Sequence, residues 1–195
     1  MIAEYLLDPD VAVELRAALG AAPIPSLMLP AAIDPPTLAG LRAGLAAAGT
    51  VPYDLADRGR YRLNASLRVD GLWTKLAATT SLLTGAPHLV AGARWLELGH
   101  GDYGLARDDA CTRPAGPHVE LTLDLSETCS GEAEIVYSAG ATAVIVPQLP
   151  ALLSLVARDP SVFRYERPLT FRSAHLRIVR LRVWLVPATS LAPPA

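Results

Sequence analysis

The stretch HVELTLDLS, residues 118–126, decides the fold class of this chain. Apolar residues occupy its odd-numbered positions from Val119 to Leu125, and polar residues stand between them. This two-residue period is that of a β-strand, because successive side chains of a strand point to opposite faces of the sheet. The pattern therefore predicts a sheet with one buried face.

Similar β-rich runs lie on both sides of this stretch. They are ARWLEL (93–98), AEIVYS (133–138), ATAVIVP (141–147) and HLRIVRLRVWLV (175–186). Clusters of Gly, Pro and Ser separate the runs at intervals that are typical of an all-β sandwich or barrel. We expect this β unit to form the core of the protein over residues 91–187.

The first part of the chain carries helical signals instead. Asp followed by Pro begins the segments 8–20 and 34–49, and glycine ends the segments 8–20, 34–49 and 71–85. Asp before Pro is a typical helix start and Gly a typical helix end. We therefore expect three helices here, with a short strand in PIPSLMLPAAI (23–33).

The order of these segments predicts a single α+β domain. Residues 1–90 would form a mainly helical support region packed on the outside of the sheet. No Gly/Ser-rich linker divides this region from the β unit. The Pro/Ala-rich end, residues 188–195, is expected to be a flexible tail.

The composition limits the possible partners and compartments. Of 195 residues, 51% are hydrophobic and 18% are charged, and the formal net charge is −2. A polybasic nucleic-acid patch and an apolar run of roughly 18 residues are both missing from the sequence, so we expect neither nucleic acid nor a membrane as a partner. The N-terminal MIAEYLLDPD lacks a signal-peptide pattern, which favours a cytoplasmic protein. Cys111 and Cys129 are too few for a disulfide framework.

Four segments in the second half together resemble a known family. They are GDYGLARDD (101–109), HVELTLDLSETCSGEAEIVY (118–137), AVIVPQLPALLSLV (143–156) and RYERPLTFRSAHLRIVRLRVWL (164–185). Their order and spacing resemble those of the Fe(II)/2-oxoglutarate-dependent oxygenases, in particular the prolyl-4-hydroxylase-like branch, over residues 30–187. The resemblance implies a double-stranded β-helix, a cupin-like jelly roll, with N-terminal helices packed on the sheet. It also implies a dioxygenase that uses Fe(II) and 2-oxoglutarate to hydroxylate a small molecule or a peptide side chain.

The metal-binding motif that the resemblance implies is degenerate in this sequence. With Tyr103 as the fixed point, Ala106 stands at the first metal-binding His and Asp108 at the carboxylate. Counting back from Pro168 places Arg164 at the second His. Alanine offers no lone pair, and a guanidinium places a cation where the iron should bind. Ordinary iron binding is therefore not expected in this register.

A second reading places the metal upstream, at His100 and Asp102. Two side chains spaced by one residue on a strand point to the same side, so both could reach one ion. The glycines Gly99, Gly101 and Gly104 favour a turn at this place instead. The candidate metal ligands are thus Asp108, His100 and Asp102, and a further His would have to be His118 or His175.

The last strand carries the candidates for cofactor binding. The resemblance implies that one basic residue there grips 2-oxoglutarate through a bidentate contact. Arg177 fits by its spacing, and Arg180 fits by its nearness to Trp184. Residues 177 and 180 lie on opposite faces of a strand, so at most one of these two side chains can point into the barrel. The alternative for Arg180 is an exposed Arg-rich face, and the alternative for Arg177 is a solvated strand end. Arg164 is the third candidate, and its alternative is a buried salt bridge with Asp108 in place of the metal. The charge cluster expected at this end of the barrel also includes Asp109, Arg177, Arg180 and Arg182.

Two functions follow from these patterns and stay open. The first is an active oxygenase with unusual metal ligation. The second is a metal-free degenerate member, which acts as a ligand-binding or protein-interaction module through Arg164 and the strand arginines. Ala106 could also be an engineered replacement for histidine, which a return substitution would test. Loops read the substrate in such folds, and the Arg-rich passage 53–68 is the candidate here.

Overall fold

The computed structural model describes residues 2–69 and 71–191, which form helices and one large sheet. The strands are β1 (Ser26–Leu29), β2 (Val51–Leu55), β3 (Gly59–Asn64), β4 (His88–Leu98), β5 (Tyr103–Gly104), β6 (His118–Asp124), β7 (Ile135–Ala139), β8 (Thr142–Val146), β9 (Leu153–Arg158), β10 (Phe163–Glu166) and β11 (Ile178–Pro187). The helices are α1 (Pro9–Ala21), α2 (Pro35–Ala48), α3 (Leu72–Thr84) and α4 (Ala106–Thr112), with short 3-10 helices η1 (Glu4–Leu7), η2 (Phe171–Ser173) and η3 (Ala188–Leu191).

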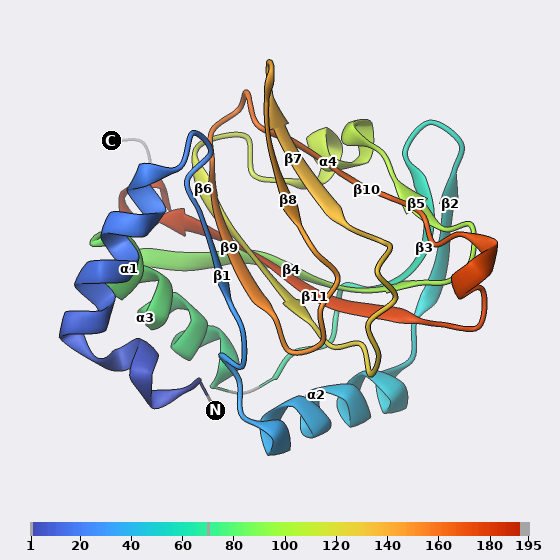
Figure 1. Cartoon of the computed structure of the whole chain (residues 1–195), viewed down its shortest axis with the longest axis horizontal. Coiled ribbons are helices and arrows are strands. Elements are labelled where there is room, and N and C mark those ends of the chain that lie inside the picture. Colours follow the sequence, from blue (N-terminus) through green and yellow to red (C-terminus); the bar gives the residue numbers. More distant parts are fainter. Residues whose placement is uncertain (1, 70, 192–195) are drawn as a thin grey trace.

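The strands pair antiparallel in the order β1-β9-β6-β11-β4-β3-β5-β10-β7-β8, and β2 pairs with β3. From β6 onward the chain passes back and forth between two halves of the sheet, with β6, β9 and β11 in one half and β7, β8 and β10 in the other. One half centres on β9, β6, β11 and β4, and the other on β5, β10, β7 and β8. This is the double-stranded β-helix that the sequence predicts, and the expected fold class is confirmed. Figure 1 shows the long strands β4 and β11 crossing the molecule between the helices and the β7–β8 hairpin.

The three expected N-terminal helices form, and α2 and α3 end at the expected glycines, Gly49 and Gly85. The expected end of α1 at Gly20 is wrong, because this helix continues to Ala21. The Asp8 side chain accepts the backbone N–H of Asp10 at the start of α1, and the Asp34 side chain accepts that of Thr37 at the start of α2. Gly85 ends α3 in the left-handed conformation, with φ of 77°. These caps satisfy backbone groups that a helix leaves without intrahelical partners.

The main hydrophobic core lies between these helices and the outer face of the sheet. Leucines of α2 and α3 pack against the odd-numbered residues of β6 and β11 and against Trp95 of β4. Figure 1 shows α1 and α3 side by side at one edge and α2 beneath the strands. Burial of this apolar face supplies the main driving force for folding.

The expectation that only one face of HVELTLDLS is buried is wrong. All seven residues of β6 are buried, including Glu120, Thr122 and Asp124 on the polar face. The polar face is covered because the sheet rolls up, so that this face becomes the inside of the barrel. The polar residues are therefore interior residues, and they need partners there.

The passage 53–68, expected as a substrate-reading loop, contributes most of the hairpin β2–β3. β3 pairs with β4 in one half of the sheet and with β5 in the other, so the hairpin links the two halves. The N-terminal region thus adds strands as well as helices. Of the expected tail, residues 188–191 form η3 and residues 192–195 lie outside the described residues.

In the part of the chain that the structure describes, every helix is too short or too polar to cross a bilayer.

Candidate functional site

The inside of the barrel holds a cluster of ionised side chains from several strands. The register of β6 and β11 places Asp124 opposite Arg180, so opposite charges face inward side by side. β9, β10 and α4 bring further charged side chains to the same space. The members of this inner ion-pair cluster, all buried, are Asp109, Glu120, Asp124, Glu166, Arg158, Arg164, Arg180 and Arg182.

Glu120 of β6 is the centre of the cluster. Its Oε2 lies 2.5 Å from Nη1 of Arg158, and its Oε1 lies 3.1 Å from Nε of Arg164 and 3.2 Å from Nε of Arg182. The Nε–H groups of Arg164 and Arg182 make no hydrogen bond among the described residues, so these two contacts are ion pairs only. One carboxylate therefore ties together strands β6, β9, β10 and β11.

Arg164 of β10 lies among three carboxylates. Its Nη1 donates to Glu166 at 2.8 Å, its Nε lies 3.1 Å from Glu120, and its Nη2 lies 3.4 Å from Asp109. Its backbone N–H also donates to Asp109 at 3.0 Å. The guanidinium thus occupies the place among these acidic groups that a bound cation would need.

The rest of the cluster is held by short, charge-assisted contacts. Arg158 donates to both oxygens of Asp109, at 2.9 Å and 2.5 Å, which is a bidentate pair. Glu166 accepts from Arg180 at 2.8 Å and from Arg182. Arg182 and Arg180 point into the barrel from the same face of β11, and both guanidinium groups are paired there with acidic side chains.

Four arginines balance four carboxylates in this buried space. Burial by itself raises the pKa of Glu120, but Arg164, Arg158 and Arg182 hold that pKa well below its usual range. Burial also raises the pKa of Glu166, and the neighbouring arginines lower it to about 2. Both carboxylates therefore stay ionised at neutral pH because of their partners.

Asp108 points away from this cluster, toward the β2–β3 hairpin. The hydroxyls of Tyr53 and Tyr61 each donate to one of its carboxylate oxygens at 2.9 Å. The two rings are stacked, with centroids 4.7 Å apart. Burial, and next the negative charge of Asp108, raise the pKa of Tyr61, so this hydroxyl keeps its proton at neutral pH.

The expected salt bridge between Arg164 and Asp108 does not form. Arg164 pairs with Asp109 instead. Residues 106–112 form α4, and successive side chains of a helix point about 100° apart. Asp109 therefore faces the barrel while Asp108 faces the tyrosines.

We predict that Tyr61→Phe destabilises the fold by about 1–3 kcal/mol, because the buried Asp108 carboxylate loses a hydrogen-bond donor. Tyr53→Phe should cost less, since Tyr53 is only half-buried. Urea unfolding followed by circular dichroism measures both. Equal stability of Tyr61→Phe and the parent protein would contradict the role assigned to this hydroxyl.

The positions at which the resemblance places metal ligands do not fit Fe(II). Ala106 has no donor atom, Asp108 is engaged by two tyrosine hydroxyls, and Arg164 is a cation. Within residues 2–69 and 71–191, no group of three His, Cys, Asp or Glu side chains is placed to hold a metal ion. Non-haem iron of this kind needs two imidazoles and a carboxylate on one face.

The upstream pair His100 and Asp102 lies in a turn. Gly101 between them has φ of 74°, a left-handed conformation that favours glycine. Asp102 accepts the backbone N–H of Gly99 at 2.8 Å and pairs with Arg60 at 3.1 Å. His100 is exposed. The structure therefore does not bring these two side chains together with Asp108.

The two candidate arginines of the last strand lie on opposite sides of the sheet. Arg180 is buried inside the barrel, so the alternative of an exposed Arg-rich face is wrong. Arg177 lies outside, and its side chain is 64% exposed. Arg180 is bound to Glu166 and also donates to the carbonyl of Ala133.

The sequence patterns did not indicate four of the eight members of the inner ion-pair cluster. These four residues are Glu120, Asp124, Arg158 and Glu166. A signal was present, because acidic residues alternate along β6 and basic residues alternate along β11, with apolar residues between them in both. Opposite charges on two alternating strands of a barrel indicate cross-strand pairs.

Comparisons with known proteins support the fold. No protein-family model matches the chain, and no curated protein matches it. Among solved structures, an oxidoreductase of the 2OG-Fe(II) oxygenase family from Burkholderia pseudomallei is similar, with a TM-score of 0.68 at 13% identity over 89% of this chain and 90% of that chain. A prolyl hydroxylase from Trichoplax adhaerens, in complex with a hypoxia inducible factor peptide fragment, gives 0.68 at 10% identity over 98% and 96%.

A Pseudomonas putida prolyl-4-hydroxylase gives a TM-score of 0.62 at 13% identity, over 89% of this chain and 98% of that chain. At such low identity the likeness concerns the fold. This chain thus has the double-stranded β-helix of the Fe(II)/2-oxoglutarate oxygenases, including their prolyl hydroxylases.

Proposed function

We propose that this chain is a metal-free protein of the 2-oxoglutarate oxygenase fold, which binds a ligand or a partner protein and does not oxidise a substrate. The observation that carries the proposal is the position of Arg164. Its guanidinium lies among Asp109, Glu120 and Glu166, at the strand position where the resemblance calls for a metal-binding histidine.

The energetics of this arrangement support the proposal. A divalent cation beside Arg164 would meet a fixed positive charge in a space of low dielectric constant. Moving Arg164 aside would leave three buried carboxylates without one of their partners, which costs several kcal/mol. Any rearrangement that opens a metal site here therefore has to break buried ion pairs of Arg164.

The arginines of β11 that face the barrel are also paired with buried carboxylates. In the oxygenases a basic residue on this strand is expected to hold the carboxylate of 2-oxoglutarate. Here Arg180 and Arg182 both donate to Glu166, and Arg182 also lies beside Glu120. A 2-oxoglutarate carboxylate would have to displace a protein carboxylate of the same charge.

A titration with Fe(II) tests the proposal. Under anaerobic conditions, isothermal calorimetry with Fe(II) and 2-oxoglutarate should give no stoichiometric binding, and oxygen should then produce no succinate. The Burkholderia pseudomallei oxygenase is a suitable positive control. Binding of about one equivalent of Fe(II) together with turnover of 2-oxoglutarate would contradict the proposal.

We further predict that Ala106→His does not restore iron binding. The new imidazole would supply one ligand, but Arg164 and the tyrosine-bound Asp108 would remain. The same calorimetric titration should therefore give the parent result. Stoichiometric Fe(II) binding by Ala106→His would instead show that the alanine is the only defect of the site, as an engineered replacement would be.

A further inference from the structure

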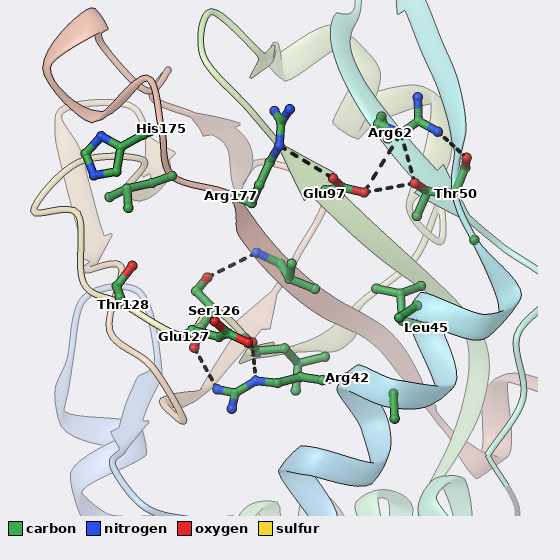
Figure 2. Close-up of a pocket in the computed structure, with 16 residues that line it drawn as sticks. Arg42, Leu45, Thr50, Arg62, Glu97, Ser126, Glu127, Thr128, His175 and Arg177 are labelled. Carbon is green, nitrogen blue, oxygen red and sulfur yellow. Dashed lines mark hydrogen bonds and ion pairs between the residues drawn. The ribbon is translucent and has the colours of Figure 1, made fainter.

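A second site lies outside the barrel. A cavity of about 910 Å³ opens between the second half of α2 and the outer face of the sheet. The end of β4, the start of β11 and the loop after β6 form its other walls, as Figure 2 shows. No member of the inner ion-pair cluster lines this cavity, so it is separate from the barrel interior.

Arg177 supplies an available guanidinium at this cavity. Its closest carboxylate contact is a loose one, 3.8 Å from Nε to Glu97, and among the described residues its two Nη groups make no hydrogen bond. Figure 2 shows the Nη atoms directed away from Glu97. The guanidinium lies directly over Gly99, where a Cβ atom would stand 1.8 Å from Nη1. Gly99 therefore makes room for this position of Arg177.

Arg42 of α2 supplies a second positive charge. Its Nε donates to the carbonyl of Leu125 at 2.6 Å, and its Nη2 donates to the carbonyl of Ser126 at 2.7 Å. Both acceptors are neutral, and no ion pair of Arg42 occurs among the described residues. These bonds fix the half-buried side chain at the cavity and leave its charge to attract an anion.

The balance of groups in the cavity indicates what kind of ligand fits. Three arginines, the third being Arg62, face two glutamates, Glu97 and Glu127, which leaves one positive charge in excess. A small excess suits a monoanion better than a doubly charged phosphate ester. The remaining lining combines apolar side chains, among them Leu45, Leu125 and Val179, with the polar residues Thr50, Ser126, Thr128 and His175. This apolar surface suits a hydrocarbon body.

We propose that this cavity binds an organic monocarboxylate. The carboxylate would bind the free Nη groups of Arg177 through a bidentate contact, and the hydrocarbon part would lie on the apolar lining. The assignment goes beyond the metal-free barrel proposed above and does not depend on it.

The test uses octanoate as the probe, with the full chain in solution. Titration followed by amide chemical shifts should show saturable binding, with the largest changes at Ser126 and Val179. Arg177→Gln should weaken binding about tenfold, because a charge-assisted contact is lost. Arg172→Gln, an exposed arginine outside the cavity, is the matched control and should bind as the parent does.

Two comparison ligands test whether the carboxylate group determines the affinity. Octan-1-ol should bind at least about tenfold more weakly than octanoate if the carboxylate contact contributes as proposed. Octyl phosphate should bind no more tightly than octanoate. The assignment would be overturned if octanoate did not bind, if octan-1-ol bound with equal affinity, or if octyl phosphate bound more tightly. It would also be overturned by full octanoate affinity in Arg177→Gln, or by chemical-shift changes centred on Glu166 in the barrel. None of these outcomes bears on whether the barrel binds Fe(II).

Discussion

Replacing Glu120 by glutamine should lower the free energy of unfolding by about 3–5 kcal/mol, the cost of removing one partner from a buried ion-pair network. Glutamine keeps the size of the side chain, but its single carbonyl oxygen can replace only one of the two acceptor oxygens, Oε1 and Oε2, to which Tyr137 and Trp184 donate at 2.8 Å and 3.1 Å. The negative charge is lost as well, and Arg158, Arg164 and Arg182 then share too few carboxylates. Urea unfolding at neutral pH measures the effect.

The same Glu→Gln substitution at the protein surface separates the effect of burial from the effect of charge on the free energy of unfolding. Glu134 pairs with Arg167 at 2.5 Å, but both side chains are partly exposed, so Glu134→Gln should cost less than about 1 kcal/mol. The double variant Glu120→Gln with Arg182→Gln restores the charge balance and should be more stable than the sum of the two single effects predicts. Similar stability losses for Glu120→Gln and Glu134→Gln would contradict the account of the cluster.

Acid should destabilise the protein strongly between about pH 4.5 and pH 2, the second large effect. The pKa of Glu166 is about 2 in the folded chain, against the usual 4.5. A group whose folded pKa is lowered contributes stability above its unfolded pKa, and this contribution is lost as the pH falls toward the folded pKa. The difference corresponds to roughly 3 kcal/mol for Glu166. Glu120, whose pKa is also lowered, adds to the effect in the same direction.

Unfolding free energies measured by urea titration from about pH 7 down to about pH 3 check this prediction. Glu166→Gln supplies the control, because it removes one of the two groups and should flatten the acid limb of the profile. A parent protein as stable at about pH 3 as at about pH 7 would show that the two buried carboxylates are not held ionised by the arginines.

The sequence contains enough information for the fold but not for the barrel interior. Alternation in residues 118–126 identifies which residues share a face of β6, and this part of the prediction is confirmed. Alternation does not say whether the polar face meets solvent or another part of the chain, because that depends on how the whole sheet closes. The alternation therefore predicts Glu120 on the face away from the core, although this buried residue is the centre of the cluster.

The error at Asp108 has a different physical origin. The resemblance placed Asp108 at the carboxylate position of the metal site by its spacing from Tyr103. Residues 106–112 form a helix, which rotates Asp108 toward Tyr53 and Tyr61 and turns Asp109 to Arg164. A short segment without strong helix signals does not reveal this rotation, and one residue of register decides which carboxylate enters the barrel.

A crystal structure from crystals soaked with Mn(II) and 2-oxoglutarate tests the central claim most directly, since Mn(II) is an anomalous scatterer that takes the same kind of ligands as Fe(II). The account predicts no anomalous peak between residues 106, 108 and 164, with the Arg164 guanidinium still bound to Glu166 and Asp109. An anomalous peak beside Asp108, with Arg164 displaced from these carboxylates, would contradict it.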